Sequence, residues 1–442
     1  MNDKTPPGPS GLAPLTSAIG MFKDAVGFAR SMVETYGSIS RTRIGADVTW
    51  FIAEPSAIEE LLLSKHKVMH KDSITAKLKN ALGEGLVTSE GELWKKQRRL
   101  AAPTLGRRQI ASYADTMVEC ARDYAEGLCK GDSIDVNEDM SAVTMRIVVC
   151  TLFGADVADE VKTVQAALHT VLSQFDAEIH TWRFFLPDAI PTPGRIESKR
   201  AVKTLDTIVN RYIELRRADE EPGDDLISRL LAATDEDGTR MPAKQLRDEA
   251  ITMFAAGHET TSIALTNTFY QLARHPEAAA RLDAELEEVL QGRDPTIADL
   301  PKLVWTNACL QESLRISPPA WIIGREPQED VEIGGYQVKK GDQLVVPIAA
   351  MCRSERWFLR PNQYEPERWL DGLEERLPRF AFLPFGGGPR VCIGNHFAMM
   401  ELVLVFVTIR MRHKFDVDPN FVLEHEPAVT LRPANGLPAQ VA

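Results

Sequence analysis

The sequence predicts a mainly α-helical protein with small β-sheets. Apolar residues recur every three to four positions through most of residues 104–310, whereas strand-like patterns occur in only two places. No internal repeat and no low-complexity linker divides the 442 residues. We therefore expect one large domain over residues 1–442, with a flexible segment rich in Pro and Gly at residues 1–15.

Start and stop signals delimit the expected elements. The helices expected in the second half of the chain are Pro242–Arg274, Pro276–Leu290 and a third from Pro301 to Ile316. His275-Pro276 and Ser317-Pro318 end two of these helices, because proline cannot continue the hydrogen-bond ladder. The expected strands are a short pair within Thr42–Ala53, a hairpin of residues 331–338 around Gly334-Gly335, and Gln343–Pro347.

Composition excludes several classes of protein. The chain has 51 Lys and Arg against 63 Asp and Glu, a net charge of −12, so we expect no general affinity for nucleic acid. The strongest apolar run, Leu402–Ile409, is far shorter than the roughly 20 residues that span a bilayer. The N-terminus shows no secretory signal, and six scattered cysteines without a C-x-x-C pair suit a reducing compartment. These features predict a cytoplasmic protein.

One cysteine stands in a distinctive setting. Residues 385–394 read Phe-Gly-Gly-Gly-Pro-Arg-Val-Cys-Ile-Gly and lead directly into an apolar helical pattern. A helix N-terminus stabilises the thiolate of Cys392, and the glycines leave room for a large flat ligand. Arg390 could reach an anionic group of that ligand, and Phe385 could shield the sulfur from water. Together these features suit a thiolate ligand of haem iron.

A second unusual segment lies midway along the long helix expected at Pro242–Arg274. Residues 256–261 read Ala-Gly-His-Glu-Thr-Thr, and glycine and paired threonines have low helix propensity. A threonine hydroxyl can bond the carbonyl one turn back or release it. We therefore expect the helix to widen here and make room for a small molecule.

These motifs resemble those of the cytochrome P450 family, of the soluble bacterial type. Phe385, Gly388, Arg390, Cys392 and Gly394 match its haem-binding signature. Further segments similar to family motifs occur in the expected order, namely Trp94 to Arg98, Ala256 to Thr260, Glu312 to Arg315 and Pro366 to Trp369. The resemblance implies the cytochrome P450 fold, with haem b between the long oxygen-activating helix and the helix after Cys392.

The resemblance also implies roles for individual residues. Thr260 would donate a hydrogen bond to bound dioxygen, and Glu259 would relay protons to it, whereas His258 is not expected to be a ligand. The residues expected to bind the haem propionates are Trp94, Arg98 and Arg325. Glu312 and Arg315 share a helix face, and with Arg368 they would form an ion network that locks the cysteine loop in place.

The substrate pocket is expected to be apolar and built from separated segments. Its candidate residues are Leu86, Val87, Phe254, Ala255, Ala320, Ile322 and Val429, with an aromatic stretch at Phe175, Trp182, Phe184 and Phe185. Such a lining suits a fatty acid, a terpenoid or another lipophilic secondary metabolite. Core packing explains any one of these side chains equally well.

The function implied is a haem-thiolate monooxygenase that hydroxylates or epoxidises an apolar substrate with dioxygen and two external electrons. A peroxide-driven peroxygenase and a non-catalytic haem-thiolate carrier or sensor are the alternatives. No flavin or iron–sulfur segment is recognised, so we expect the electrons to come from ferredoxin and ferredoxin reductase. NAD(P)H would then be used only indirectly. We also expect the protein to be a monomer. A docking face or merely solvated helices would explain the basic residues Lys95, Lys96, Arg99, Arg107, Arg108, Arg410, Arg412 and Lys414.

Overall fold

The computed structural model forms two compact units, each assembled from separate stretches of the chain. The first unit comprises Met1–Ala76, Asn307–Cys392 and His425–Arg432, and the second comprises Lys77–Thr306, Ile393–Glu424 and Pro433–Ala442. The residues described here are 5–10, 20–21, 23–45, 47–154, 158–179, 181, 186–187, 190–218, 223–235 and 238–442.

The first unit holds most of the β-structure. Its strands are β1 (Ile39–Ile44), β2 (Asp47–Ile52), β3 (Met69–His70), β5 (Ile323–Pro327), β6 (Val331–Ile333), β7 (Tyr336–Val338), β8 (Gln343–Val346) and β10 (His425–Pro427). Its helices and helical turns are α2 (Ala25–Tyr36), α3 (Pro55–Glu59), η1 (Glu60–Ser64), η2 (His66–Val68), α16 (Ile348–Cys352), η7 (Pro366–Trp369), α17 (Leu373–Arg376) and η8 (Gly388–Arg390). Three elements cross a unit boundary, namely α4 (Ser73–Lys77), α15 (Val304–Ile316) and β11 (Leu431–Pro433).

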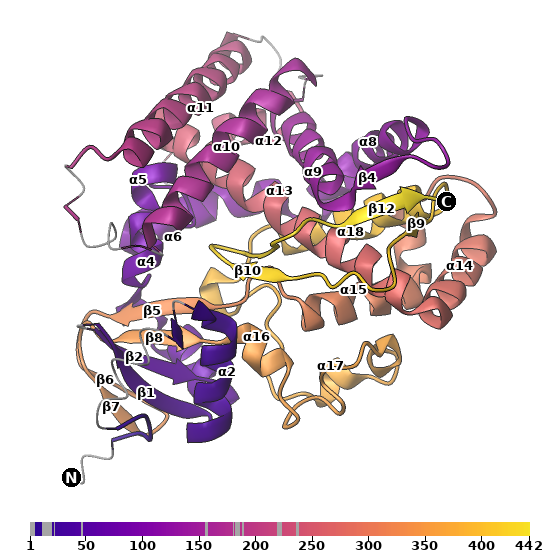
Figure 1. The fold of residues 1–442 in the computed structure, drawn as a ribbon. Coiled ribbons are helices and arrows are strands. Elements are labelled where there is room, and N and C mark those ends of the chain that lie inside the picture. The colour runs from indigo at the N-terminus through magenta and orange to yellow at the C-terminus, as the bar shows by residue number, and fades with distance from the viewer. Residues whose placement is uncertain are drawn as a thin grey trace. The chain divides into compact units, whose positions relative to one another are not determined.

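A five-stranded sheet organises the first unit, with strand order β1-β2-β8-β5-β3. β1 and β2 form an antiparallel hairpin, and β2 pairs with β8 in parallel, with Thr49 opposite Gln343. Helix α2 lies against this sheet (Figure 1), where Met32 packs with Phe51 in a small buried cluster. The carboxylate of Asp24 caps α2 by accepting a hydrogen bond of 2.8 Å from the backbone N–H of Gly27.

The second unit is mainly helical. Its longer helices are α6 (Gly91–Ala101), α8 (Ala114–Glu126), α9 (Val136–Phe153), α10 (Ala158–Ile179), α11 (Pro193–Ala218), α13 (Ala243–Arg274), α14 (Pro276–Leu290) and α18 (Asn395–Arg410). Its short helices and turns are α5 (Lys79–Leu82), η3 (Ala102–Leu105), α7 (Arg107–Ile110), η4 (Ala111–Tyr113), α12 (Leu226–Ala232) and η6 (Ile297–Lys302). A small sheet joins β4 (Ser133–Asp135), β12 (Pro438–Val441) and β9 (Phe415–Asp416).

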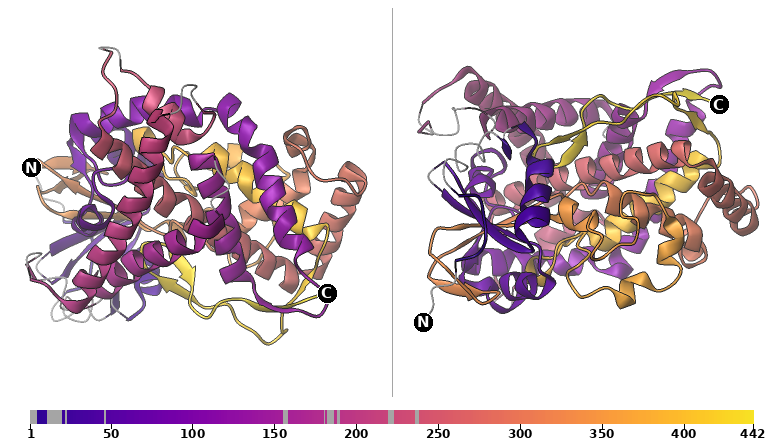
Figure 2. Two further views of the ribbon diagram at one scale, coloured as in Figure 1. Left: turned by 90° about the horizontal axis from the view of Figure 1, so that it is seen from above. Right: turned by 60° about the horizontal axis from the view of Figure 1, so that its bottom comes forward.

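Helix α13 is the axis of the second unit. It packs against α9 and α18, and the rings of Phe269 on α13 and Phe406 on α18 lie 4.9 Å apart. Figures 1 and 2 agree in showing α10 and α11 side by side. Most of α13 is buried, so apolar side chains around its whole circumference reach neighbouring helices. The buried part of α13 also carries polar side chains, and the hydroxyls of Thr266 and Thr268 each bond the carbonyl one turn back.

The predicted fold class is confirmed, and so are the helices that end at Arg274 and at Leu290. The prediction that a helix starts at Pro301 is wrong. Pro301 lies inside the 3₁₀ helix η6, which begins with a reciprocal capping box between Thr296 and Asp299. Leu303 separates η6 from α15. The short strands β3, β4, β5, β9, β10, β11 and β12 were not predicted, because two to five residues give too little alternation to be recognised on their own.

Part of the expected flexible lead is docked on the first unit. The carbonyl of Pro7 accepts a hydrogen bond of 3.0 Å from the backbone N–H of Arg41 in β1. Residues 1–4 and 11–15 of that lead lie outside the described part of the chain. Among the described residues, no helix combines the length and apolarity that crossing a bilayer requires.

Candidate active site

The cysteine loop of the first unit is held by its own backbone. The N–H of Cys392 donates a 2.9 Å hydrogen bond to the carbonyl of Phe385, and Val391 closes η8 by donating to Gly388 over 3.1 Å. The side chains of Phe385 and Arg390 are half-buried, and that of Cys392 is exposed. The loop therefore presents the thiol at a surface while its backbone groups stay bonded.

Two of the loop glycines are required by protein contacts. Gly388 has a φ of +69°, and a Cβ there would lie 2.0 Å from the carbonyl oxygen of Leu62 in η1. A Cβ on Gly387 would lie 2.5 Å from Cε1 of Phe380. We expected these glycines to make room for a ligand, whereas both are needed for the loop to pack against Phe380 and Leu62 of the first unit.

The residues that follow Cys392 fit a thiolate-bound haem. Gly394 is the N-cap of α18, and a Cβ there would meet no heavy atom within 4 Å, so this position does offer room to a ligand. The N-terminal N–H groups of α18 favour a negative charge on a sulfur that precedes them by three residues. Haem iron is bound by a thiolate in sites of this kind, and the missing side chain next to the thiolate leaves space for the porphyrin.

Glu312 is the centre of a buried ion network in the first unit. Its carboxylate accepts hydrogen bonds from Arg315 (2.8 and 2.9 Å), from Nε of Arg368 (3.0 Å) and from Nε1 of Trp369 (2.9 Å). The backbone N–H of Glu365 donates a further bond of 2.9 Å. Since Glu312 is fully buried, these donors replace the water that its charge would otherwise need.

Arg315 is equally buried and equally satisfied. Besides Glu312, its guanidinium donates to the carbonyls of Cys352 (2.7 Å), Pro361 (2.7 Å) and Gln363 (3.0 Å). The structure thus brings Glu312, Arg315 and Arg368 together. Their bonds fix residues 352–369, the segment that precedes the cysteine loop in the chain, rather than the loop itself.

The three residues assigned to the haem propionates lie on two elements. Arg325 is on β5, is 7% exposed, and donates to the carbonyl of Gly324 over 2.7 Å. Trp94 and Arg98 are one turn apart on α6, with Trp94 buried and Arg98 half-buried. Their i, i+4 spacing places them on one face of α6, as two donors to a single carboxylate require.

The turn at residues 256–261 stays α-helical, so the expected widening is wrong. The hydroxyl of Thr260 donates to the carbonyl of Ala256 over 2.7 Å, and that of Thr261 donates to Gly257 over 3.0 Å. Both hydroxyls bond the carbonyl one turn back while the ladder around them continues from Ala243 to Arg274. The side chains of Glu259 and Thr260 are half-buried.

Helix α9 supports this turn from behind. A Cβ on Gly257 would lie 3.1 Å from Cγ2 of Val148, and the hydroxyl of Thr144 donates to the carbonyl of His258 over 3.1 Å. Gly257 is therefore needed where α9 and α13 approach closely. The His258 ring is buried and bonds the carbonyl of Phe254 through Nδ1 (2.8 Å), and burial lowers its pKa to about 4. His258 is thus a neutral packing residue.

The predicted pocket residues are only partly accessible. The prediction is wrong for Phe254, which is fully buried with its ring 5.2 Å from that of Phe153 and so belongs to the core. Ala255 is buried in the same core cluster. Leu86, Val87, Ala320 and Ile322 are half-buried, and Val429 is 37% exposed. Trp182, Phe184 and Phe185 lie outside the described residues.

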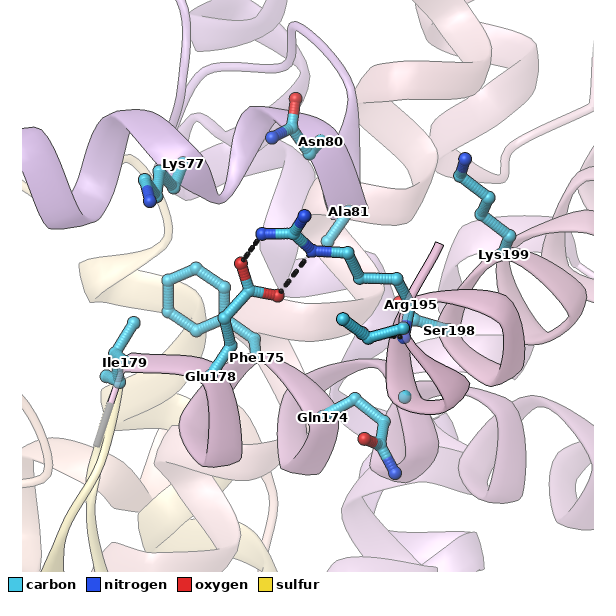
Figure 3. Close-up of a pocket in the computed structure, with 12 residues that line it drawn as sticks. Lys77, Asn80, Ala81, Gln174, Phe175, Glu178, Ile179, Arg195, Ser198 and Lys199 are labelled. Carbon is cyan, nitrogen blue, oxygen red and sulfur yellow. Dashed lines mark hydrogen bonds and ion pairs between the residues drawn. The ribbon is translucent and has the colours of Figure 1, made fainter. Parts of the chain in front are cut away.

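A cavity of about 290 Å³ in the second unit was not predicted as such. It lies between α5, α10 and the start of α11, and of the predicted residues it includes Phe175. Glu178 and Arg195 face one another in it (Figure 3), with Nε of Arg195 donating to Glu178 over 3.1 Å. These two residues are 17 positions apart on different helices, a spacing that carries no sequence signal.

Most of the basic residues proposed for a docking face are paired with acids of the second unit. Arg410 and Lys414 both bond Asp283 at 2.8 Å. Further ion pairs join Lys95 to Glu92, Lys96 and Arg99 to Asp235, and Arg412 to Asp294. Arg107 and Arg108 are exposed, and Arg107 bonds His396 over 3.2 Å. This pairing favours solvated helix faces over a continuous basic surface.

Comparison with known proteins places the chain among haem-thiolate oxygenases. The family model for cytochrome P450 matches residues 6–436. A putative cytochrome P450 132 from Mycobacterium bovis is 33% identical over 91% of each chain. Two relatives are named for oxidation reactions and are each 32% identical over 88% of this chain: cyclooctat-9-en-7-ol 5-monooxygenase of Streptomyces melanosporofaciens (84% of its length) and pentalenene oxygenase of Streptomyces avermitilis (87%).

Proposed function

The chain belongs to the cytochrome P450 family, and from that premise we propose that it is a monooxygenase that hydroxylates or epoxidises a terpenoid. The family is one of oxidoreductases whose cofactor is a cysteine-ligated haem. The terpenoid part of the proposal is supported by relatives named for cyclooctatin synthesis and for pentalenene oxidation. The apolar pocket candidates Val429, which is exposed, and Ile322, which is half-buried, are compatible with such a substrate.

The haem would be held by one thiolate and by side chains that donate hydrogen bonds to carboxylates. Cys392 would supply the thiolate, and Arg325, Arg390, Arg98 and Trp94 would bind the propionates. When bound, the haem supplies the site at which dioxygen is bound and reduced.

The proton chemistry is assigned to the side chains of α13. Between Glu249 and Phe269 most residues are buried, but Ala256 is exposed and Gly257, Glu259 and Thr260 are half-buried. The helix therefore presents an acid and a hydroxyl at one accessible patch, and this observation carries the proposal. Glu259 would exchange protons with solvent and pass them on to the reacting oxygen.

The hydroxyl of Thr260 can leave its helical partner at small cost. Its 2.7 Å bond to the Ala256 carbonyl is an ordinary hydrogen bond, worth about 1 kcal/mol net. Rotation about χ1 would free the O–H to donate to oxygen, while the carbonyl of Ala256 remains at an exposed residue where water can replace the lost donor. Thr260 would thereby hold a proton at a defined position.

We propose that the electrons come from a ferredoxin reduced by a ferredoxin reductase, because members of the family typically receive electrons from redox partners. Since most of the basic side chains are paired, docking would rest on few residues, with Arg107 and Arg108 the exposed candidates. NADPH would be consumed only by the reductase.

A turnover assay with surrogate ferredoxin and ferredoxin reductase tests this function. Terpenes and fatty acids would first be screened by the spin-state shift of the purified protein, and the best binder used as substrate. We expect substrate-dependent NADPH oxidation, with product formed per NADPH at least about tenfold lower in Thr260→Ala and Glu259→Gln than in the wild type. Thr268→Ala is the matched control, because Thr268 is a buried α13 residue whose hydroxyl also bonds a carbonyl one turn back.

The alternatives predict different results. A peroxygenase would form product from hydrogen peroxide as fast in both variants as in the wild type, and a carrier or sensor would show no substrate-dependent NADPH use. A red-shifted Soret band of the reduced carbon monoxide complex, lost in Cys392→Ser and kept in Thr260→Ala, would show that the variants differ in chemistry rather than in haem ligation.

A further inference from the structure

Helices α8 and α9 of the second unit carry a pair of cysteines on their contact face. The two helices follow one another along the chain, and polar contacts at successive levels join them: Tyr124 to Asp139 and Arg146 to Asp123, both at 2.8 Å. Cys120 lies one turn before Asp123 on α8, and Cys150 lies one turn after Arg146 on α9. The side chains of Cys120 and Cys150 are hydrogen-bonded to each other.

The two thiols differ in access to solvent. Cys120 is 3% exposed, whereas Cys150 is half-buried, so a small molecule in solution can reach Cys150 first. The guanidinium of Arg146 lies close enough to both sulfurs to interact electrostatically with each. A nearby cation favours the thiolate, which is the reactive form of cysteine. The hydrogen bond that the Cys120 thiol makes to Cys150, together with burial, raises the pKa of Cys120 above its ordinary range, so Cys120 is the poorer first nucleophile.

We propose that Cys150 and Cys120 are a modification site that hydrogen peroxide converts reversibly into a disulfide between α9 and α8. In the first step the Cys150 thiolate attacks one peroxide oxygen, an S–O bond forms, the O–O bond breaks, and the leaving hydroxide takes a proton to become water. In the second step the Cys120 sulfur attacks the resulting sulfenic acid, loses its proton, and expels the hydroxyl group as a second water. Two electrons pass from the two sulfurs to the peroxide.

A disulfide between Cys120 and Cys150 would affect the helix that supports the Gly257–His258 turn. Helix α9 contacts the Gly257–His258 turn of α13 through Val148 and Thr144, which precede Cys150 by two and six residues. A covalent bond to α8 would restrict the displacement of this supporting helix. An oxygenase releases hydrogen peroxide when dioxygen is reduced but no substrate is oxidised, so this protein could produce its own oxidant. Only this source of the peroxide rests on the proposed function.

The test uses the full-length holoenzyme and added hydrogen peroxide. After treatment, remaining thiols are alkylated, the protein is digested, and peptides are identified by mass spectrometry. We expect a cross-linked peptide joining Cys120 and Cys150, lighter by two hydrogen atoms than the two reduced peptides, that disappears on treatment with dithiothreitol. Cys129→Ser, which removes an exposed cysteine beyond the end of α8, is the matched control and should still form it.

Single variants distinguish the two roles. In Cys120→Ser, Cys150 should be trapped as a sulfenic acid that dimedone labels, whereas in Cys150→Ser labelling of Cys120 should be at least tenfold weaker. The proposal is overturned if folded wild-type protein leaves Cys150 reduced while Cys129 oxidises, or if Cys120→Ser shows no dimedone adduct at Cys150. Because peroxide is added, an inactive monooxygenase would leave these results unchanged, so the two proposals fail separately.

Discussion

Replacing Glu312 with glutamine should strongly destabilise the first unit. Glu312→Gln keeps the shape of the side chain but removes its charge, while Arg315 stays fully buried beside it. One amide oxygen would have to replace two carboxylate oxygens that accept bonds from Arg315, Arg368, Trp369 and the N–H of Glu365. The amide N–H₂ would also face these donors.

The magnitude follows from burial. Breaking a buried ion pair by removing one partner costs about 3–5 kcal/mol, because the other charge remains without compensation in a poorly polarisable interior. The carbonyls of Cys352, Pro361 and Gln363 still accept from Arg315 and so place the expected loss near the lower end, about 3 kcal/mol. Glu34→Gln is the matched control: its partner Arg30 is also on the first unit, but both side chains are about half-exposed, and the cost should be below about 0.5 kcal/mol.

Urea unfolding followed by circular dichroism at neutral pH measures both variants, with haem content determined on the same samples from the Soret absorbance. We expect the Glu312→Gln protein to unfold at a clearly lower urea concentration and to retain less haem. An unfolding free energy within about 0.5 kcal/mol of the wild type would refute the argument that Arg315 depends on this carboxylate.

Three further predictions concern the cysteine loop and two buried titratable groups. Gly388→Ala should lower the melting temperature and the haem content, because its Cβ would lie 2.0 Å from the Leu62 carbonyl, whereas Gly394→Ala meets no protein atom and should fold normally. Burial holds the pKa of His258 at about 4 instead of 6.5, so the stability of the wild type relative to His258→Gln should fall by about 3 kcal/mol as pH falls from 6.5 to 4 in urea unfolding. Burial raises the pKa of Glu249 from 4.5 to about 7, so in the same assay the stability of the wild type relative to Glu249→Gln should fall by about 3 kcal/mol as pH rises through that range. Because the two contributions oppose one another between pH 4.5 and 6.5, each is measured as a difference from its own variant.

Sequence patterns predicted the elements whose signals are local. The helix ending at Arg274 is marked by a long apolar periodicity and by the following His-Pro, and the hairpin around Gly334-Gly335 by two residues that both take positive φ in the structure. The i, i+3 spacing of Glu312 and Arg315 also survives in the structure as a direct ion pair. In each case the interacting residues are neighbours along the chain, so the pattern itself fixes the geometry.

Features that depend on tertiary packing could not be predicted from the sequence. Nothing local distinguishes Phe254, which packs on Phe153 in the core, from an aromatic residue that lines a pocket. The pairing of Glu178 with Arg195 likewise depends on how α10 and α11 come together. The regular hydrogen bonding at Thr260 could not be foreseen either, since a threonine in mid-helix can bond the carbonyl one turn back or release it, and the sequence does not decide between the two.

The glycines show how one motif can serve two physical ends. Gly387 and Gly388 have no room for a side chain because Phe380 and the carbonyl of Leu62 lie where a Cβ would stand. Glycine would be required at both positions even in a protein that binds no cofactor, so these two residues are poor evidence for haem. Gly394 is different, because the protein places nothing within 4 Å of its missing Cβ. A loss of haem on substitution of Gly394 would therefore not come from a clash with the protein. The effect of Gly394→Ala on haem affinity, measured in a variant that folds normally, therefore bears more directly on the cofactor than any substitution in the preceding three glycines.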